Sequence, residues 1–302
     1  MLGCVPAMTE SKNPMTRGLD HVVHVVRDLA AAAAVYERLG FQVGAENVHP
    51  WGTKNRLVQL PRFYIELLWI PQAAKLPAPS RRFYSFGAFN REYLQACGEG
   101  LSSLALQSSD PRAEAAEFER AGFGGFEVLD FARMAKRPDG RETEVAFSLA
   151  FARDPASPHA GFFTCLQKTP ERIWFAELQR HQNGANAVSA AVLVADNPTD
   201  HHIFLEAFSG ARDVRATSLG LRIETPRGEI LVYDPRAFVD AFGGEAPKEE
   251  GLRLAALVFQ VGDLAAARKW LESSGLAPRY LHNRLVIGPS GARGAVIAFE
   301  SA

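Results

Sequence analysis

The sequence predicts an α+β protein made of four tandem β-α-β-β-β modules that pair into two domains. An apolar run, then Asp, eleven residues, and Gly with an apolar residue recurs with one spacing at 28–41, 110–123 and 263–276. A fourth copy, 196–210, is two residues longer. One such unit cannot close a core alone, so four units favour two pairs, each with a curved sheet.

The first module supplies the pattern for the others. Apolar and β-branched residues at 19–26 predict a strand. Asp28 suits the N-cap of an Ala-rich helix over 29–39, and Gly40 suits the position just beyond its end. Three strand-like runs follow, at 41–48, 56–60 and 63–70.

The remaining modules repeat this order. The second is expected to comprise a strand at 101–107, a helix at 111–121 and strands at 126–133, 144–152 and 161–166. The third is expected to comprise a strand at 187–195, a helix at 199–208 and strands at 214–219, 221–225 and 230–233. The fourth is expected to comprise a strand at 252–261, a helix at 264–274 and strands at 278–282, 284–287 and 295–299. Residues 71–100 fit no module and are expected to form an irregular, aromatic-rich excursion.

Pairing the modules in chain order gives the domain boundaries. The first domain is expected at 18–170 and the second at 187–302, with a linker at 171–186 where the pattern is interrupted. Residues 1–17 are predicted to be a disordered tail, because they lack the charged and continuous apolar regions of a signal peptide.

Composition narrows the class of protein. The 302 residues are 47% hydrophobic and 22% charged, as in folded soluble proteins. A net charge of −1 argues against nucleic acid or an anionic membrane as a partner, and no apolar run approaches the roughly 18–20 residues that span a bilayer. The 3 cysteines are far apart, which favours a reducing compartment and a cytoplasmic location.

Two residues depart from the apolar patterning of the first module. His21 lies on its first strand, on the face of Val23, and Glu66 lies on its last strand, on the face of Tyr64 and Leu68. A buried carboxylate is costly unless it meets a cation or a hydrogen-bond donor. A His–Glu pair can bind a divalent metal, or act as a general base with an orienting partner. The alternative is a structural His–Glu hydrogen bond.

The repeat and these residues together resemble a known superfamily. Tandem β-α-β-β-β modules resemble the vicinal oxygen chelate superfamily, which includes glyoxalase I, extradiol dioxygenases and bleomycin-resistance proteins. His21 with Asp28-Leu29, His49, Gly52-Thr53-x-Asn55 and Ile65-Glu66-Leu67 is similar to its glyoxalase-like domain branch. The resemblance implies half-barrel domains and metal ligands on the first and last strands of a module. Those positions are His21, seven residues before Asp28, and Glu66.

The other modules lack obvious ligands at the corresponding positions. The first-strand positions hold Ser103, Ser189 and Ala256, and the fourth module's last-strand position holds Ala298. The last strand of the second module offers Thr164, Cys165 or Gln167. We therefore expect a partial site in the first domain that holds one divalent metal (Zn, Ni, Mn or Fe) weakly or not at all, and a second domain that serves as scaffold.

Several residues near the expected site can contact a ligand. His49 and Asn55 flank the turn between the second and third strands, where they serve either turn geometry or a pocket rim. Tyr64 can shield the site from water, and Gln167 can bind a substrate carbonyl from the opposite side of the barrel. One of three arginines in the second module could also bind an anion, although such side chains are usually solvated: Arg133, Arg141 and Arg153.

The resemblance leaves two functions open, because this fold hosts unrelated activities. The first is a glyoxalase-like lyase, isomerase or dioxygenase acting on a small carbonyl or hydroxy compound, with Glu66 as metal ligand or as base. The second is a metal-free protein that binds or sequesters a small molecule, as bleomycin-resistance proteins do. Four modules can satisfy one another within one chain, so we expect a monomer or a homodimer.

Overall fold

The computed structural model describes residues 16–248 and 250–302. Most of the predicted disordered tail therefore lies outside the described residues. Arg17, at the end of that predicted tail, is buried: its backbone N–H donates to the Ser209 carbonyl at 2.8 Å and its guanidinium pairs with Glu117 at 2.5 Å. Within the described residues, none of the helices combines the length and apolar character needed to cross a bilayer.

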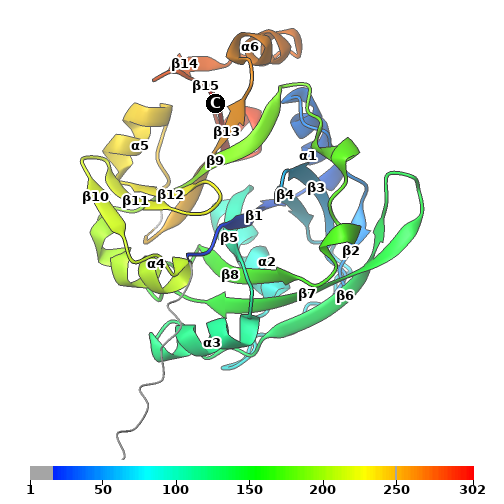
Figure 1. Cartoon of the computed structure of the whole chain (residues 1–302), viewed down its shortest axis with the longest axis vertical. Coiled ribbons are helices and arrows are strands. Elements are labelled where there is room, and N and C mark those ends of the chain that lie inside the picture. The colour runs from blue at the N-terminus through cyan, green and yellow to red at the C-terminus, as the bar shows by residue number, and fades with distance from the viewer. Residues whose placement is uncertain (1–15, 249) are drawn as a thin grey trace, which may run out of the picture.

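Within the described residues, sixteen strands form two eight-stranded sheets. Figure 1 shows how the two sheets are arranged. The strands of the first sheet are β1 Leu19–Val26, β2 Asn47–Val48, β3 Lys54–Leu60, β4 Phe63–Trp69, β5 Gly100–Gln107, β6 Leu129–Lys136, β7 Glu142–Ala152 and β8 Gly161–Gln167. Those of the second are β9 Ala185–Val194, β10 Val214–Thr217, β11 Gly220–Glu224, β12 Glu229–Tyr233, β13 Arg253–Val261, β14 Arg279–Leu281, β15 Arg284–Ile287 and β16 Val296–Ser301.

The strand order confirms four modules in two pairs. It is β2-β3-β4-β1-β5-β8-β7-β6 in the first sheet and β10-β11-β12-β9-β13-β16-β15-β14 in the second. In each module the first strand is parallel to the last. Two modules join through their first strands, which run antiparallel, β1 with β5 and β9 with β13.

Each module helix follows its first strand. These helices are α1 Leu29–Arg38, α3 Pro111–Arg120, α4 His202–Ser209 and α6 Leu264–Ser273. The side chains of Asp28, Asp110 and Asp263 each accept backbone N–H groups of the first turn, which explains the repeated Asp. The longer copy of the repeat at 196–210, in the third module, begins instead with a 3₁₀ turn, Pro198–His201, which leads into α4.

Two sequence predictions about these elements were wrong, and one helix was not predicted. The strand predicted at 41–48 is reduced to β2, because Phe41 turns into the core instead of alternating along a sheet edge. The excursion at 71–100 is not irregular throughout, since it contains α2 Phe86–Cys97, capped by Ser85. A further helix that was not predicted, α5 Pro235–Phe242, follows the third module.

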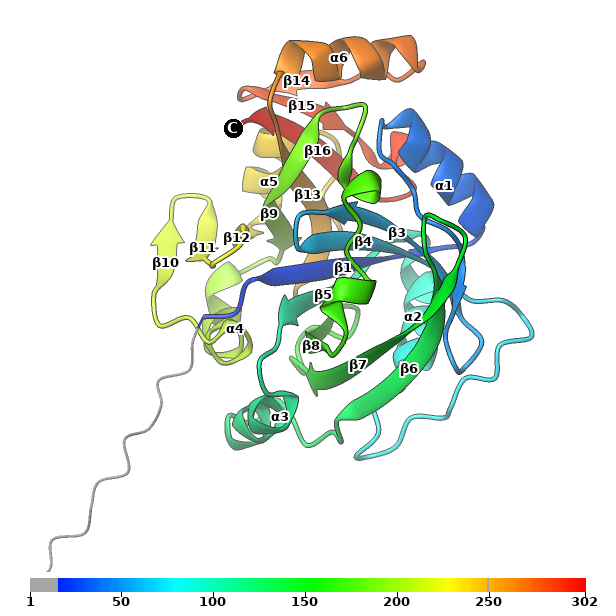
Figure 2. The same cartoon turned by 45° about the vertical axis from the view of Figure 1, so that its right-hand side comes forward.

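The convex faces of the two sheets share one hydrophobic core. Alternation along β1 places Val22 in this shared core and Val23 on the concave face. Alternation along β9 likewise places Leu193 in the shared core and Val192 on the concave face. Strands β5 and β13 pack against each other, and α1 lies beside the α6 end of the second half (Figure 2). The indole N–H of Trp270 on α6 donates to the Arg38 carbonyl at 3.2 Å.

The concave faces differ between the two halves. In the second half, Phe238 and Phe242 of α5 occupy the concave face and pack with Val192 and Val258. In the first half, the edge strands β2 and β6 approach each other, and the Lys136 N–H donates to the side chain of Asn47 at 3.4 Å. The first sheet therefore curls into a nearly closed barrel whose interior carries polar as well as aromatic side chains.

We expect Gly40→Ala to destabilise the protein more than Gly122→Ala. Both glycines end a module helix at positive φ, 89° and 83°, so both substitutions cost about 1–2 kcal/mol in backbone strain. At Gly40 an added Cβ would also lie 2.8 Å from Asn183 and from the Trp270 indole, whereas at Gly122 nothing lies within 4 Å. Overpacking should add about 1–3 kcal/mol to the loss of unfolding free energy at Gly40. Urea unfolding measures both, and equal losses would contradict this packing.

His24 should make the protein less stable as the pH falls. Its Nδ1 lies 2.8 Å from the Tyr36 hydroxyl and its Nε2 donates to the Arg293 carbonyl at 2.8 Å, inside the shared core. Burial lowers the pKa of His24 from 6.5 to about 4. Between these values only the unfolded chain takes up the proton, so the unfolding free energy falls by up to about 1.4 kcal/mol per pH unit as the pH drops.

His24→Gln should remove this contribution, because an amide can keep both hydrogen bonds but does not titrate. Denaturant unfolding between pH 7 and pH 4.5 provides the measurement, with the exposed His202→Gln as control. Parallel pH curves for the wild type and His24→Gln would show that His24 is not the titrating group.

Candidate functional site

The concave face of the first barrel forms a partly open cavity. The volume open to the centres of water-sized molecules is about 30 Å³. Its walls combine a few polar side chains with many aromatic ones. The lining residues are His21, His49, Trp51, Asn55, Leu57, Tyr64, Glu66, Phe86, Phe131, Arg133, Phe147, Leu149, Phe163 and Cys165.

A bulge in β1 fixes the orientation of His21. The pairing of β1 with β5 shifts between Leu19 and His21, which leaves Asp20 as the extra residue. The Asp20 carboxylate lies 2.6 Å from His21 Nδ1 and also accepts from the Gln167 amide at 3.0 and 3.2 Å. A carboxylate is an acceptor, so Nδ1 carries the proton and Nε2 faces the cavity. The ring of Tyr64 stacks on the imidazole, with centroids 4.3 Å apart.

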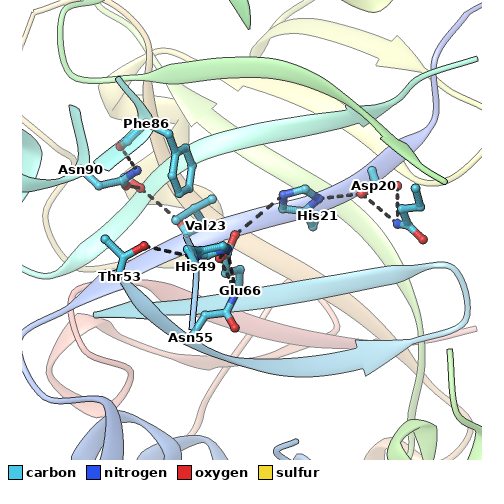
Figure 3. A network of polar contacts seen from close by, with 11 residues as sticks. Asp20, His21, Val23, His49, Thr53, Asn55, Glu66, Phe86 and Asn90 are labelled. Atoms are coloured by element: carbon cyan, nitrogen blue, oxygen red, sulfur yellow. Dashed lines mark hydrogen bonds and ion pairs between the residues drawn. The ribbon is translucent and has the colours of Figure 1, made fainter. Parts of the chain in front are cut away.

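Glu66 lies between two histidines (Figure 3). Its Oε1 accepts from the Asn55 amide at 2.6 Å and lies 3.5 Å from His49 Nε2. Its Oε2 lies 4.0 Å from His21 Nε2. One carboxylate oxygen is therefore held by Asn55, and the other faces His21 across the cavity.

His49 is held in a neutral state. Its Nδ1 lies 2.9 Å from the Thr53 hydroxyl and its ring stacks on Trp51, with centroids 4.9 Å apart. Burial lowers the pKa of His49 well below 6.5, and the nearby Arg133 and His21 lower it further. At neutral pH His49 therefore acts as a hydrogen-bonding group without charge.

Tyr64 and Cys165 both stay protonated at neutral pH. Burial raises the pKa of the Tyr64 hydroxyl well above 10, with Cys165, Asp20 and Glu66 adding to the shift. Burial also raises the pKa of the Cys165 thiol, again reinforced by Asp20 and Glu66. Tyr64 can therefore donate a hydrogen bond to a ligand, whereas Cys165 does not present a thiolate.

The structure brings together most of the predicted site residues. His21, His49, Asn55, Tyr64 and Glu66 all line the one cavity. Gln167 does not line it: its amide lies behind His21 and holds Asp20.

Asp20 was not predicted, although a charged residue inside an apolar strand was a visible signal. The sequence does not show the bulge that turns its side chain towards His21.

The second module supplies no matching pair of ligands. The register of β1 with β4 places Glu66 two residues beyond the partner of His21. The register of β5 with β8 places Phe163 two residues beyond the partner of Ser103. Phe163 is thus the counterpart of Glu66, and it contributes an aromatic wall to the cavity.

The side chains around His21 are of types compatible with a metal. Ligand atoms of Asp20, His21 and Cys165 lie within 4.8 Å of one another. The hydrogen bond between Asp20 and His21 leaves no room for an ion between their ligand atoms, and Cys165 is protonated. These three residues therefore suit a hydrogen-bonded support for His21 better than a metal site. The pair of His21 Nε2 and Glu66 Oε2 fits an ion better, since two ligands of one Zn²⁺ lie roughly 3 to 4 Å apart.

The chain belongs to a family defined as a glyoxalase-like domain, whose model matches residues 19–208. This match covers the whole first half, including every residue of the cavity, and the start of the second half. Among curated proteins, no sequence matches this chain.

Solved structures share the fold. A hypothetical protein from Staphylococcus aureus is 13% identical, with a TM-score of 0.66, over 94% of this chain and 99% of that one. A variant of 4-hydroxymandelate synthase from Streptomyces coelicolor is 10% identical, with a TM-score of 0.57, over 94% and 92% of the two chains. A fusion of a xylose isomerase-like TIM barrel with 4-hydroxyphenylpyruvate dioxygenase is 16% identical, with a TM-score of 0.53, over 92% of this chain and 42% of that one. At these identities the likeness shows the vicinal oxygen chelate fold alone.

We expect the neutral His21 ring to carry its proton on Nδ1, because Asp20 accepts there. Long-range ¹H–¹⁵N NMR correlations distinguish this tautomer from the other. Asp20→Ala should shift His21 towards a mixture of tautomers, whereas Gln167→Ala should leave the Asp20–His21 bond and the tautomer intact. A wild-type His21 protonated on Nε2 would contradict the arrangement, since that nitrogen would then be unavailable to a metal.

Proposed function

We propose that this protein is a glyoxalase-like enzyme that acts on a small carbonyl or hydroxy compound at His21 and Glu66, with a divalent metal as cofactor. The observation that carries the proposal is the pair of His21 Nε2 and Glu66 Oε2, 4.0 Å apart and facing one cavity. A histidine whose second nitrogen is held by a carboxylate is the arrangement commonly found behind metal ligands.

The residues of the cavity would have different roles in this reaction. His21 and Glu66 would hold the ion, which when bound supplies Lewis-acid stabilisation of a developing oxyanion. Asn55 keeps Oε1 of Glu66 occupied, so Oε2 is the oxygen that either binds the ion or takes a proton next to a carbonyl. Tyr64 can donate a hydrogen bond to a substrate oxygen, and the aromatic walls exclude water. The reaction type proposed is that of a lyase, an isomerase or a dioxygenase.

A metal-free binding protein is the second candidate. It is favoured by Ser103 and Phe163, which stand where a second pair of ligands would complete the metal shell. Two protein ligands alone bind a metal weakly, because water or substrate must supply the rest. On this reading Glu66 and the histidines are a hydrogen-bonded group that recognises a polar ligand.

The same proposal covers the organisation of the protein. We infer a site-bearing domain at 18–170 and a scaffold domain at 187–302. The filled concave face of the second sheet supports the scaffold role. A cytoplasmic location and a monomeric or homodimeric state are further parts of the proposal, to be tested by fractionation and by light scattering.

At saturating metal the wild type should bind about one ion per chain, and His21→Ala/Glu66→Ala should bind none. Purified protein is brought to equilibrium by dialysis against buffer that contains Zn²⁺, Ni²⁺, Mn²⁺ or Fe²⁺, and the bound metal is measured by elemental analysis of both sides of the membrane. The exposed His202→Ala serves as the control for adventitious binding by surface histidines and should keep the wild-type content.

Two results would count against a metalloenzyme. Equal metal content in the wild type and the double variant would place the ion elsewhere. Absence of bound metal at saturating concentrations, measured by equilibrium dialysis to include weak binding, would favour the metal-free binding protein.

A further inference from the structure

Two hydrogen-bond donors of the cavity have no partner. Arg133 Nε and the Trp51 indole N–H are buried and unpaired within the described part of the chain, and both side chains line the cavity. None of the acceptor atoms lining the cavity is left buried and unpaired in the same way, again among described residues. An unmet buried donor costs about 1–3 kcal/mol. These two donors therefore lack an acceptor.

Arg133 is also a cation that makes no direct ion pair within the described chain. It is 9% exposed, its guanidinium lies 5.8 Å from the ring centre of Phe147, and Nη1 donates to the Met134 carbonyl at 3.3 Å. Glu66 attracts it across the cavity, yet within the described chain its nitrogens have no carboxylate within 4.0 Å. An arginine keeps its charge even when buried. A buried positive charge therefore faces the site without a directly paired carboxylate.

The two donors both lie beside Phe131. The ring of Trp51 packs edge-on against Phe131, with centroids 5.1 Å apart. Phe131 and Arg133 are two residues apart on β6, so they share a face at a spacing of about 7 Å. His21 and Glu66 come instead from β1 and β4.

We propose that the ligand of this cavity is a small monocarboxylate, whose carboxylate is bound by Arg133 and the Trp51 N–H. Its apolar body would lie among the aromatic rings, and its reacting group would face His21 and Glu66. This assignment rests on the proposed function, because it names the substrate class of the same cavity.

A carboxylate suits this wall better than a phosphate. The planar guanidinium matches a carboxylate with two parallel hydrogen bonds. Binding a phosphate dianion would call for a second cation, and Arg133 is the single arginine or lysine among the described residues that line the cavity. The surrounding aromatic rings favour an apolar body next to a single charged end.

The test compares butyrate with butyramide, which has nearly the same shape without the charge. In isothermal titration calorimetry the wild type should bind butyrate at least about tenfold more tightly, as expected for charge-assisted hydrogen bonds. Arg133→Met should abolish this preference, and Trp51→Phe should reduce it while keeping the ring. Arg141→Met, an exposed arginine on the same hairpin that pairs with Asp139, should leave the preference unchanged.

Stability separates recognition from a structural role. Because Arg133 makes no direct ion pair and Glu66 keeps its hydrogen bond from Asn55, Arg133→Met should stay folded, with a melting temperature close to that of the wild type. Equal binding of butyrate and butyramide by the wild type, or an unchanged preference in a folded Arg133→Met, would overturn the proposal. Metal binding by His21 and Glu66 is measured separately. If metal binds but butyrate is not preferred, the carboxylate proposal is wrong and the proposed function stands. If butyrate is preferred but no metal binds, the metal site is wrong and the carboxylate proposal stands.

Discussion

The organisation of the cavity depends on one requirement, the burial of the Glu66 carboxylate among aromatic rings. At 5% exposure this group is stable only if donors or positive charge surround it. The sheet supplies them through its register. Strand β3, antiparallel to β4, brings Asn55 to one oxygen, and β1, parallel to β4, brings His21 towards the other. Asp20 then holds His21, and Gln167 holds Asp20. From Glu66 outwards, His21 and Asp20 are thus each held by the next polar side chain in this row.

The sequence predicted the convex side of the protein better than the concave side. The Asp and Gly of the repeat cap and end helices by local hydrogen bonding and backbone geometry, so their spacing is sufficient to predict the modules. His21 and Glu66 could be predicted because they break an apolar alternation. The bulge at Asp20 could not, because it is a property of strand pairing. Arg133 could not be separated from Arg141 because only the curling of the sheet buries one of them and leaves the other in solvent.

The two halves show how one strand order accommodates different interiors. Their convex faces pack together, so both carry the same requirement for apolar residues on alternate positions. The concave faces are free of that requirement. In the second half α5 inserts Phe238 and Phe242, and the interior becomes ordinary core. In the first half the equivalent space holds the cavity. The repeat therefore describes the shared scaffold and carries no information about chemistry.

The small volume of the cavity, about 30 Å³, has a kinetic consequence. A ligand the size of the proposed monocarboxylate exceeds this volume, so its full entry would require a ring such as Trp51 or Phe131 to turn aside, and these rings are held by stacking against His49 and Phe147. Ligand association would then be a two-step process in which an opening of the aromatic wall precedes full contact. The observed association rate would level off at the rate of that opening as ligand concentration rises, instead of increasing towards the diffusion limit.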